Sequence, residues 1–205
     1  MHPSSVFHTG EQVARMIVDQ NPLATLAANG DQGPVIALVP VAWNEDGTTL
    51  IGHVARANAF WQTLKNMSPI ISAVFRAEQA YVSASAYPSK AKHGRVVPTW
   101  NYIAAEARGQ LTFRSDAESI RESVSQLSAK MEADRTNPWT VSDAPTRYID
   151  QLLNAIVAFE IDISSIRGVR KLSQNKSHVD RAGVLKELAQ RPENAAMARE
   201  MEQFR

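Results

Sequence analysis

The spacing of apolar residues changes several times along the chain, and each change predicts a change of secondary structure. Residues 10–20 carry apolar side chains three and four positions apart, which predicts a short helix that ends before Asn21-Pro22. Over residues 23–55 the apolar runs are broken by Asn29-Gly30, Gln32-Gly33 and Asp46-Gly47, which are hairpin signals. We therefore expect three antiparallel strands after the first helix.

The rest of the chain alternates between helical and strand-like patterns. The spacing predicts helices over 57–67, 116–133 and 145–154, and a helical tail from Arg181 that is interrupted at Pro192. Strands are expected over 70–75, 80–83, 101–113 and 155–163, and Gly109 within one of them indicates a bulge or a close backbone approach. Residues 86–98 have the composition of a long loop.

This order of elements predicts a fold class. Short strands joined by hairpins, with few helices between them and no strand-helix-strand rhythm, favour an antiparallel β-barrel with peripheral helices, an α+β fold, over a parallel sheet. We expect one barrel domain over residues 1–180. A C-terminal helical extension, residues 181–205, is expected to pack on the same domain.

Composition and charge narrow the function classes. The 205 residues are 44% hydrophobic and 21% charged, which is ordinary for a globular protein. Their 22 basic and 21 acidic residues give a net charge of +1, so any DNA contact must come from a local patch. The absence of cysteine excludes disulfides and thiolate metal sites. Because no signal peptide or membrane-length apolar run is visible, we expect a soluble cytoplasmic protein with no membrane partner.

One polar segment stands at a predicted strand-to-helix junction, where the sequence reads GHVARAN over residues 52–58. The free N–H groups of a helix start attract anions, and His53, Arg56 and Asn58 add donors around them. This pattern predicts a phosphate site. The alternative interpretation is that Arg56 and Asn58 only cap the helix and pair with a nearby carboxylate.

Two further segments have candidate chemistry. Trp100-Asn101-Tyr102 could wall a planar ring, although buried aromatic residues in a barrel usually belong to the core. Residues 171–175 read KLSQN, and four of these five side chains can donate hydrogen bonds, as an anion-facing loop or a polar linker would.

Metal and hydrolase sites have no support in the pattern. The five histidines are scattered and form no His-x-x-His or His-Glu-x-x-His spacing, so we assign no metal. The Gly-x-Ser-x-Gly elbow, the phosphate-binding Gly-Lys-Ser loop and the dinucleotide glycine fingerprint are also missing from the sequence.

Taken together and in this order, several segments resemble the PaiB-like family of FMN-binding negative transcriptional regulators. The segments are NPLATL at 21–26, GHVARAN at 52–58, YVSAS at 81–85, VPTWNY at 97–102, Pro138-Trp139, and KLSQN at 171–175 with Asp180-Arg181 after it. The resemblance implies a six-stranded Greek-key split barrel that forms a homodimer, with FMN in the cleft between subunits.

The resemblance also implies site residues. His53, Arg56 and Asn58 would hold the flavin phosphate, and Thr99, Trp100 and Asn101 would line the cleft. A third group would reach toward the ligand, from the same or from the partner subunit: Lys171, Ser173, Gln174 and Asn175. The chain departs from the family pattern at its opening, at Ala59 where proline is usual, at Ala86 where tryptophan is usual, and at Ala158 where glycine is usual.

Three functions stay open at this point. The first is a regulator with FMN as a structural or sensing ligand, but the sequence lacks a helix-turn-helix, and only residues 90–95 and 167–176 are locally basic. The second is a flavin-dependent oxidoreductase of the flavin or NAD(P)H reductase type, in which the flavin does the redox chemistry and no catalytic residue is assigned. The third is a haem-binding barrel with His93 or His178 as the ligand.

Overall fold

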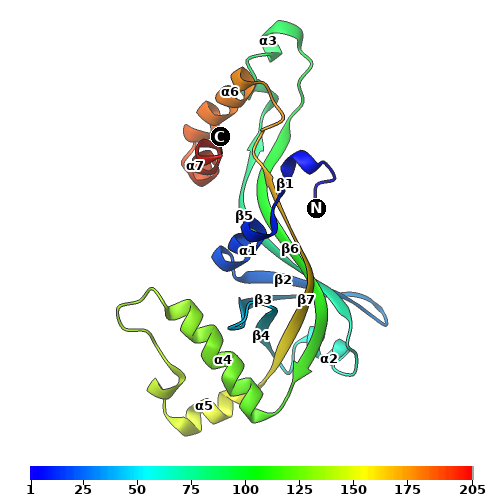
Figure 1. Cartoon of the computed structure of the whole chain (residues 1–205), viewed down its shortest axis with the longest axis vertical. Coiled ribbons are helices and arrows are strands. Elements are labelled where there is room, and N and C mark those ends of the chain that lie inside the picture. Colours follow the sequence, from blue (N-terminus) through cyan, green and yellow to red (C-terminus); the bar gives the residue numbers. More distant parts are fainter. Residues whose placement is uncertain (205) are drawn as a thin grey trace. The chain divides into compact units, whose positions relative to one another are not determined.

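A computed structural model describes residues 1–204 and contains a closed, antiparallel β-structure and several α-helices (Figure 1). The strands follow the order β1-β7-β4-β3-β2-β5-β6, and β7 pairs with β6 as well, so six of the seven strands form a ring. The short strand β1 is added on the side of β7. The expected antiparallel split barrel is therefore confirmed.

The strand bounds show how the hairpins form the ring. The strands are β1 (His8–Thr9), β2 (Leu23–Gly30), β3 (Gly33–Trp43), β4 (Thr49–Ala55), β5 (Ile70–Val82), β6 (Thr99–Arg114) and β7 (Ile156–Lys171). The β2–β3 hairpin pairs Gly30 with Gly33, and Gly33 has a positive φ of 120°, as the tight turn requires. The expected hairpin after Gly30 is thus present.

Along the chain, each α-helix lies between two strands or follows the last strand. They are α1 (Glu11–Gln20), α2 (Ala59–Leu64), α3 (Lys90–His93), α4 (Ala117–Glu132), α5 (Thr146–Leu153), α6 (His178–Ala189) and α7 (Ala195–Gln203). The expected interruption of the C-terminal tail is a short 3-10 turn at Pro192–Asn194. No helix within residues 1–204 combines the length and the apolar character that crossing a membrane requires.

The chain divides into two compact units, and the three long strands β5, β6 and β7 contribute to both. Unit 1 contains residues 1–20, 76–105 and 167–205, and unit 2 contains residues 21–75 and 106–166. The division that the sequence suggested after residue 180 stays a prediction.

Unit 2 holds the six-stranded ring. Its interior is built by alternate side chains of the strands, including Leu26, Leu50, Phe75, Leu111 and Phe159, each of which is completely shielded from solvent. The helices α4 and α5 add a second apolar cluster outside the ring, formed by Ile120, Ile149, Leu153 and Ala158. The barrel and its helical cover are therefore held by apolar burial on both faces of β7.

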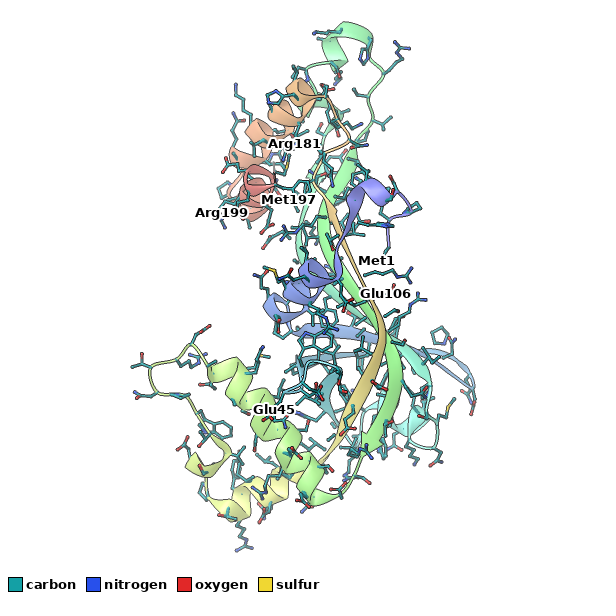
Figure 2. The ribbon with its side chains drawn as sticks, in the orientation of Figure 1. Met1, Glu45, Glu106, Arg181, Met197 and Arg199 are labelled. Atoms are coloured by element: carbon teal, nitrogen blue, oxygen red, sulfur yellow. The ribbon has the colours of Figure 1, made fainter. Side chains whose placement is uncertain are left out.

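Unit 1 combines the remaining parts of the long strands with α1, α3 and the C-terminal helices. Arg181 of α6 donates hydrogen bonds to the backbone carbonyls of Met201 and Phe204, which joins α6 to the end of α7. Figure 2 shows Arg181 on α6 and Met197 on α7. The Asp180 carboxylate accepts hydrogen bonds from the Ser89 backbone N–H at 3.0 Å and from its hydroxyl at 2.9 Å, which fixes α6 to the segment before α3.

Several predicted boundaries were wrong. Residues 70–75 and 80–83 belong to one continuous strand, β5, because the polar residues between them face solvent and interrupt the apolar alternation. For the same reason β7 continues to Lys171, eight residues beyond its predicted end at 163. The helix predicted over 57–67 is shorter in the structure, where α2 covers Ala59–Leu64. It begins after Asn58 because the Asn58 side chain caps it by accepting from the Phe60 N–H.

The loop predicted over 86–98 contains a helical turn, α3, and the helix predicted from Arg181 begins at His178. The Ser177 hydroxyl accepts from the Asp180 N–H and caps the start of α6. Hydrophobic periodicity does not detect such polar caps. The 3-10 turns and the two-residue strand β1 were not predicted at all.

Closure of the ring requires a close approach between β6 and β7. A Cβ atom at Gly109 would lie 2.1 Å from the Asp162 carbonyl oxygen, which is far inside contact distance. The obstacle is backbone that cannot rotate away. The prediction of a close backbone approach at Gly109 is therefore confirmed.

Replacing Gly109 with alanine is expected to lower the free energy of unfolding by about 1–3 kcal/mol, the usual effect of forcing extra volume into a packed interior. Urea denaturation followed by circular dichroism measures this difference. Gly10→Ala is the matched control, since nothing lies within 4 Å of the added methyl group. Equal stability of the two variants would show that the strands move apart without cost.

Candidate functional site

The end of β7 lies beside the start of β6 in unit 1. The Lys171 ammonium donates a hydrogen bond to the Thr99 hydroxyl at 2.7 Å and another to the Trp100 backbone carbonyl. An ammonium group has three N–H donors, so these two bonds leave a third for another acceptor. Lys171 is thereby held in place while one of its N–H groups remains available to a ligand.

The turn after Lys171 is fixed by buried polar side chains. The Ser173 hydroxyl donates to the Asn101 side-chain oxygen at 3.1 Å, and Asn101 is completely buried. Ser173 adopts a positive φ of 60°, an unfavourable conformation for a residue with a side chain. Gln174 accepts from the Leu172 N–H and donates to the Arg170 carbonyl, so its amide stabilises the turn itself. Strained backbone of this kind is often found at functional sites.

These residues line a cavity of about 250 Å³, here named the basic pocket. Its walls are formed by His2, Ser4, Phe7, Val97, Thr99, Asn101, Lys171, Ser173, Asn175 and Lys176. The lining contains two lysines, hydroxyls and side-chain amides, and none of these residues is acidic. Such a set of donors suits an anionic or polyhydroxyl ligand.

Electrostatics in the basic pocket also favour an anion. Burial, and then the positive charge of Lys176, lower the pKa of Lys171 below its ordinary value of 10.5. A nearby negative group would relieve this unfavourable environment and stabilise the charged form. The basic pocket is thus prepared for an anion before one binds.

The N-terminal segment supplies one wall of the basic pocket, which the sequence did not predict. The His2 and Phe7 rings contact edge to face at 4.5 Å, and the Phe7 ring centroid lies 5.9 Å from the Lys171 nitrogen. The segment is held by β1, whose His8 pairs with Val169 of β7. Because β1 has only two residues, no local periodicity could have revealed this pairing.

Trp100 lies on the opposite face of β6 from Thr99 and Asn101, because successive side chains of a strand alternate. Its indole is half exposed and contacts the Tyr81 ring at a centroid distance of 5.8 Å. The two rings form an exposed aromatic pair on β5 and β6. Trp100 therefore does not line the basic pocket.

The other three predicted residues lie in unit 2. Arg56 donates to the Asn154 backbone carbonyl at 3.0 Å and to the Ser115 backbone carbonyl at 3.4 Å. The Asn58 side chain caps α2 by accepting from the Phe60 N–H at 2.8 Å. The Asn58 cap agrees with the structural alternative that the sequence left open, whereas Arg56 binds backbone carbonyls instead of the expected carboxylate.

His53 is half-buried on β4, where it pairs in register with Ala158 of β7. Burial lowers the pKa of its imidazole, so the neutral form is favoured. Its Nδ1 atom is buried and has no hydrogen-bond partner within residues 1–204. A neutral ring on this strand is a weak partner for a phosphate compared with the lysines of the basic pocket.

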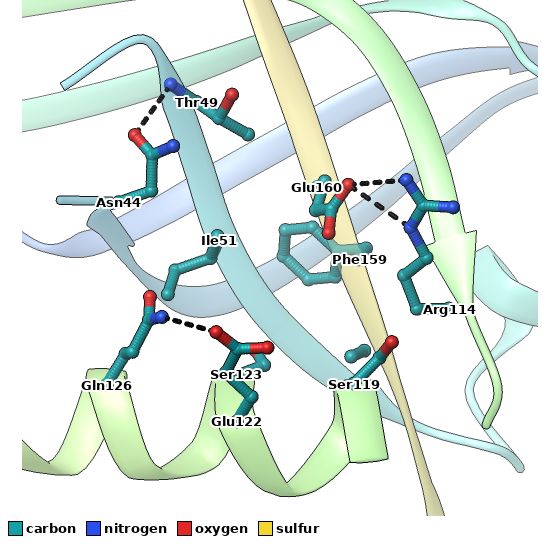
Figure 3. Close-up of a pocket in the computed structure, with 11 residues that line it drawn as sticks. Asn44, Thr49, Ile51, Arg114, Ser119, Glu122, Ser123, Gln126, Phe159 and Glu160 are labelled. Carbon is teal, nitrogen blue, oxygen red and sulfur yellow. Dashed lines mark hydrogen bonds and ion pairs between the residues drawn. The ribbon is translucent and has the colours of Figure 1, made fainter. Parts of the chain in front are cut away.

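A second polar cavity, of about 240 Å³, lies in unit 2 where α4 covers β4 and β7 (Figure 3). Arg114 is paired with Glu160 at 2.9 Å, and Gln126 donates to Glu122 at 3.1 Å. The hydrogen bonds to Glu160 raise the pKa of Arg114. None of the ten predicted residues lines this cavity, and its one cationic side chain, Arg114, is already paired with Glu160.

The candidate haem ligands are exposed. His93 ends α3 and accepts from the Arg95 N–H, while His178 begins α6. Within the described part of the chain, no group of three or more His, Asp or Glu side chains is arranged to bind a metal ion.

Five of the ten predicted residues meet in one cavity: Thr99, Asn101, Lys171, Ser173 and Asn175. Gln174 supports the turn beneath them, and Trp100 lies on the other face of β6. The remaining three residues lie in unit 2: His53, Arg56 and Asn58. Lys176 and the N-terminal wall complete the basic pocket.

Two solved structures share this fold. The FAD and haem binding protein from Mycobacterium smegmatis matches with a TM-score of 0.61 and 19% identity, over 85% of this chain and 78% of that one. A flavocytochrome from Azotobacter vinelandii matches with a TM-score of 0.61 and 14% identity, over 89% of this chain and 78% of that one. At these identities the likeness concerns the fold.

Sequence comparison gives a nearer relationship. The chain is 28% identical over 189 residues to the "Protease synthase and sporulation protein PAI 2" of Bacillus subtilis, and the match covers 90% of this chain and 88% of that protein. The family model described as "Putative FMN-binding domain" matches residues 1–165, which is most of the chain. The chain therefore belongs to the PaiB-like family of FMN-binding split-barrel proteins, whose cofactor is FMN.

Proposed function

We propose that this protein is a homodimeric regulator of gene expression that binds FMN, with the flavin phosphate held in the basic pocket. The observation that carries the proposal is the meeting of Lys171, Ser173 and Asn175 with Thr99 and Asn101 in one acid-free cavity. The regulatory role is supported by similarity along 90% of the chain to a protein named for protease synthesis and sporulation.

The chemistry of the basic pocket fits the phosphate end of FMN. Lys171 and Lys176 supply positive charge, and the hydroxyl and amide groups supply hydrogen bonds for phosphate or ribityl oxygens. The isoalloxazine ring of bound FMN can accept and donate electrons. In this proposal the protein residues bind and orient the ligand, and Lys171 keeps its proton on Nζ as a phosphate partner.

The size of the basic pocket supports binding between two subunits. Its volume of about 250 Å³ lies below the range of roughly 300–1,000 Å³ that is usual for ligands of this size. The pocket can thus enclose only part of FMN, and the ring system must contact further protein. The exposed ring of Trp100 in a second subunit is a suitable partner for a planar ring.

An apolar sheet face provides a surface for this dimer. Leu23 of β2, Ile36 and Leu38 of β3, and Ile70 of β5 are between 57% and 71% exposed, although they lie on adjacent strands of the ring. Their outward positions alternate with buried residues, as in a sheet that is covered on both sides. We name these four residues the apolar face. Exposed aliphatic groups on rigid neighbouring strands favour association with a second copy.

Removing the charge of Lys171 tests the phosphate position. Lys171→Met is expected to weaken FMN binding by about 1.5–3 kcal/mol, roughly 10- to 150-fold in Kd, because a hydrogen bond to a charged group is lost. Titration with FMN and with riboflavin, which has no phosphate, measures the effect. Riboflavin affinity should hardly change.

Arg56→Ala is the comparison variant, since the sequence placed the phosphate beside that residue. A loss of FMN affinity in Arg56→Ala with none in Lys171→Met would move the phosphate to the β4–α2 junction. Thermal unfolding of both variants shows whether either change acts through stability, which is expected for Arg56 because its guanidinium binds two backbone carbonyls.

A charge on the apolar face tests the dimer. Leu38→Lys is expected to convert a dimer into a monomer in sedimentation equilibrium, and the monomer is expected to lose FMN. Val179→Lys on α6 is the matched control, because this valine has similar exposure outside the apolar face. A monomer that binds FMN normally would contradict binding between subunits, and an unchanged dimer would exclude the apolar face.

The reaction with reduced nicotinamides separates the regulator from the alternative, a flavin-dependent oxidoreductase. In the FMN-loaded protein, excess NADH or NADPH under anaerobic conditions is expected to bleach the flavin absorbance no faster than it bleaches free FMN. Stopped-flow absorbance measures both rates. A clear acceleration by the protein would support the oxidoreductase and count against a purely sensing or structural flavin.

A further inference from the structure

Unit 1 carries a strongly basic surface at the outer end of the β5–β6 ribbon. Four basic side chains lie within six residues, and we name them the basic tip: Lys90, Lys92, His93 and Arg95. Between Glu78 and Glu106 the chain has no acidic residue. The positive charge here is local, in contrast to the net charge of +1 for the whole protein.

The basic tip is an ordered turn rather than a loose loop. The single helical turn α3 ends at Gly94, which has a φ of 66° and donates its N–H to the Lys90 carbonyl at 3.0 Å. The His93 ring then accepts from the Arg95 N–H at 3.0 Å. All four basic side chains are exposed, and within residues 1–204 none of them forms a salt bridge.

The base of this turn is anchored to α6. Asp180 accepts two hydrogen bonds from Ser89, immediately before the basic tip. Gly183 lies against the Ala86 carbonyl, with only 2.3 Å between that oxygen and the position of an added Cβ. Figure 1 shows α3 beyond the end of α6 within this unit. The anchored base lowers the conformational entropy that the three cations, Lys90, Lys92 and Arg95, lose on meeting a partner.

We propose that the basic tip binds the phosphate backbone of double-stranded DNA, an inference that rests on the proposed regulatory function. A two-stranded ribbon is narrow enough to approach a groove of the duplex, and exposed cations without salt-bridge partners at its end can replace counterions at several phosphates. Since the net charge of the protein is only +1, binding is concentrated at the basic tip and depends on salt.

DNA fits this surface better than an anionic membrane does. A helix that binds a membrane surface presents a row of large apolar side chains opposite its basic face. The only apolar residue of α3 is Ala91, and within residues 86–98 only Val97 is a large exposed hydrophobic group. The basic tip therefore offers charge with little apolar anchorage.

The test compares two full-length variants with the same change of net charge. The tip variant carries Lys90→Ser, Lys92→Ser and Arg95→Ser, and the control variant carries Lys65→Ser, Arg147→Ser and Lys186→Ser at exposed positions elsewhere. Fluorescence anisotropy with a labelled 30-base-pair duplex of arbitrary sequence is measured in the presence of FMN at several salt concentrations. Vesicles containing phosphatidylglycerol are the second probe, and thermal unfolding and FMN titration check each variant.

The wild-type protein and the control variant are expected to bind the duplex, and the tip variant at least tenfold more weakly near 100 mM salt. Each lost phosphate contact reduces the slope of log K against log salt by about 0.9, so a reduction of roughly 2–3 is expected for the tip variant. FMN affinity should be equal in all three proteins. This separates the two proposals, since loss of FMN binding by the wild type would overturn only the flavin site.

Three results would overturn the inference: no duplex binding by the wild-type protein, equal weakening in the tip and control variants, or binding of vesicles that requires the basic tip while the duplex is ignored. The first result, obtained with normal FMN binding, would leave the flavin-binding part of the proposed function intact.

Discussion

The structure depends on the pairing of β7 with two neighbours. Its first half pairs with β4 from Ile156 to Asp162, and it also pairs with β6, so the six strands close instead of leaving two free edges. Closure is possible because Gly109 lets the β6 backbone approach Asp162 directly. The same strand continues into unit 1, pairs with β1 at Gly168 and Val169, and ends at Lys171. One strand, β7, therefore both closes the barrel and carries the first lysine of the basic pocket.

The basic pocket is shaped by polar groups that satisfy one another. Asn101 and Ser173 are buried and bonded together, and Gln174 holds the turn through two backbone groups. These contacts support the positive φ of Ser173 and orient Lys171 without using its third N–H donor. A site of this kind needs little rearrangement when a ligand arrives, because its supporting hydrogen bonds are present beforehand.

Much of the fold could be predicted from the sequence, because the barrel strands of unit 2 keep the alternation and turn residues that a half-buried hairpin requires. Prediction failed where β5 and β7 continue as exposed ribbon, since polar residues such as Arg76 and Ser164 then occupy both faces. At the candidate site, KLSQN and the start of β6 were recognised as polar segments. Their meeting with His2 and Phe7 depends on the pairing of β1, a contact between distant residues that no local pattern encodes.

The family model ends at residue 165, whereas β7 continues to Lys171 and the lysines of the basic pocket follow that boundary. The matched residues thus include the N-terminal wall of the basic pocket and the start of β6, and they end before Lys171, Ser173, Asn175 and Lys176. Because β7 both pairs with β6 and carries Lys171, a slip in the β6–β7 register would move the ammonium group away from the Thr99 hydroxyl, so closure of the ring also sets the position of the pocket lysine.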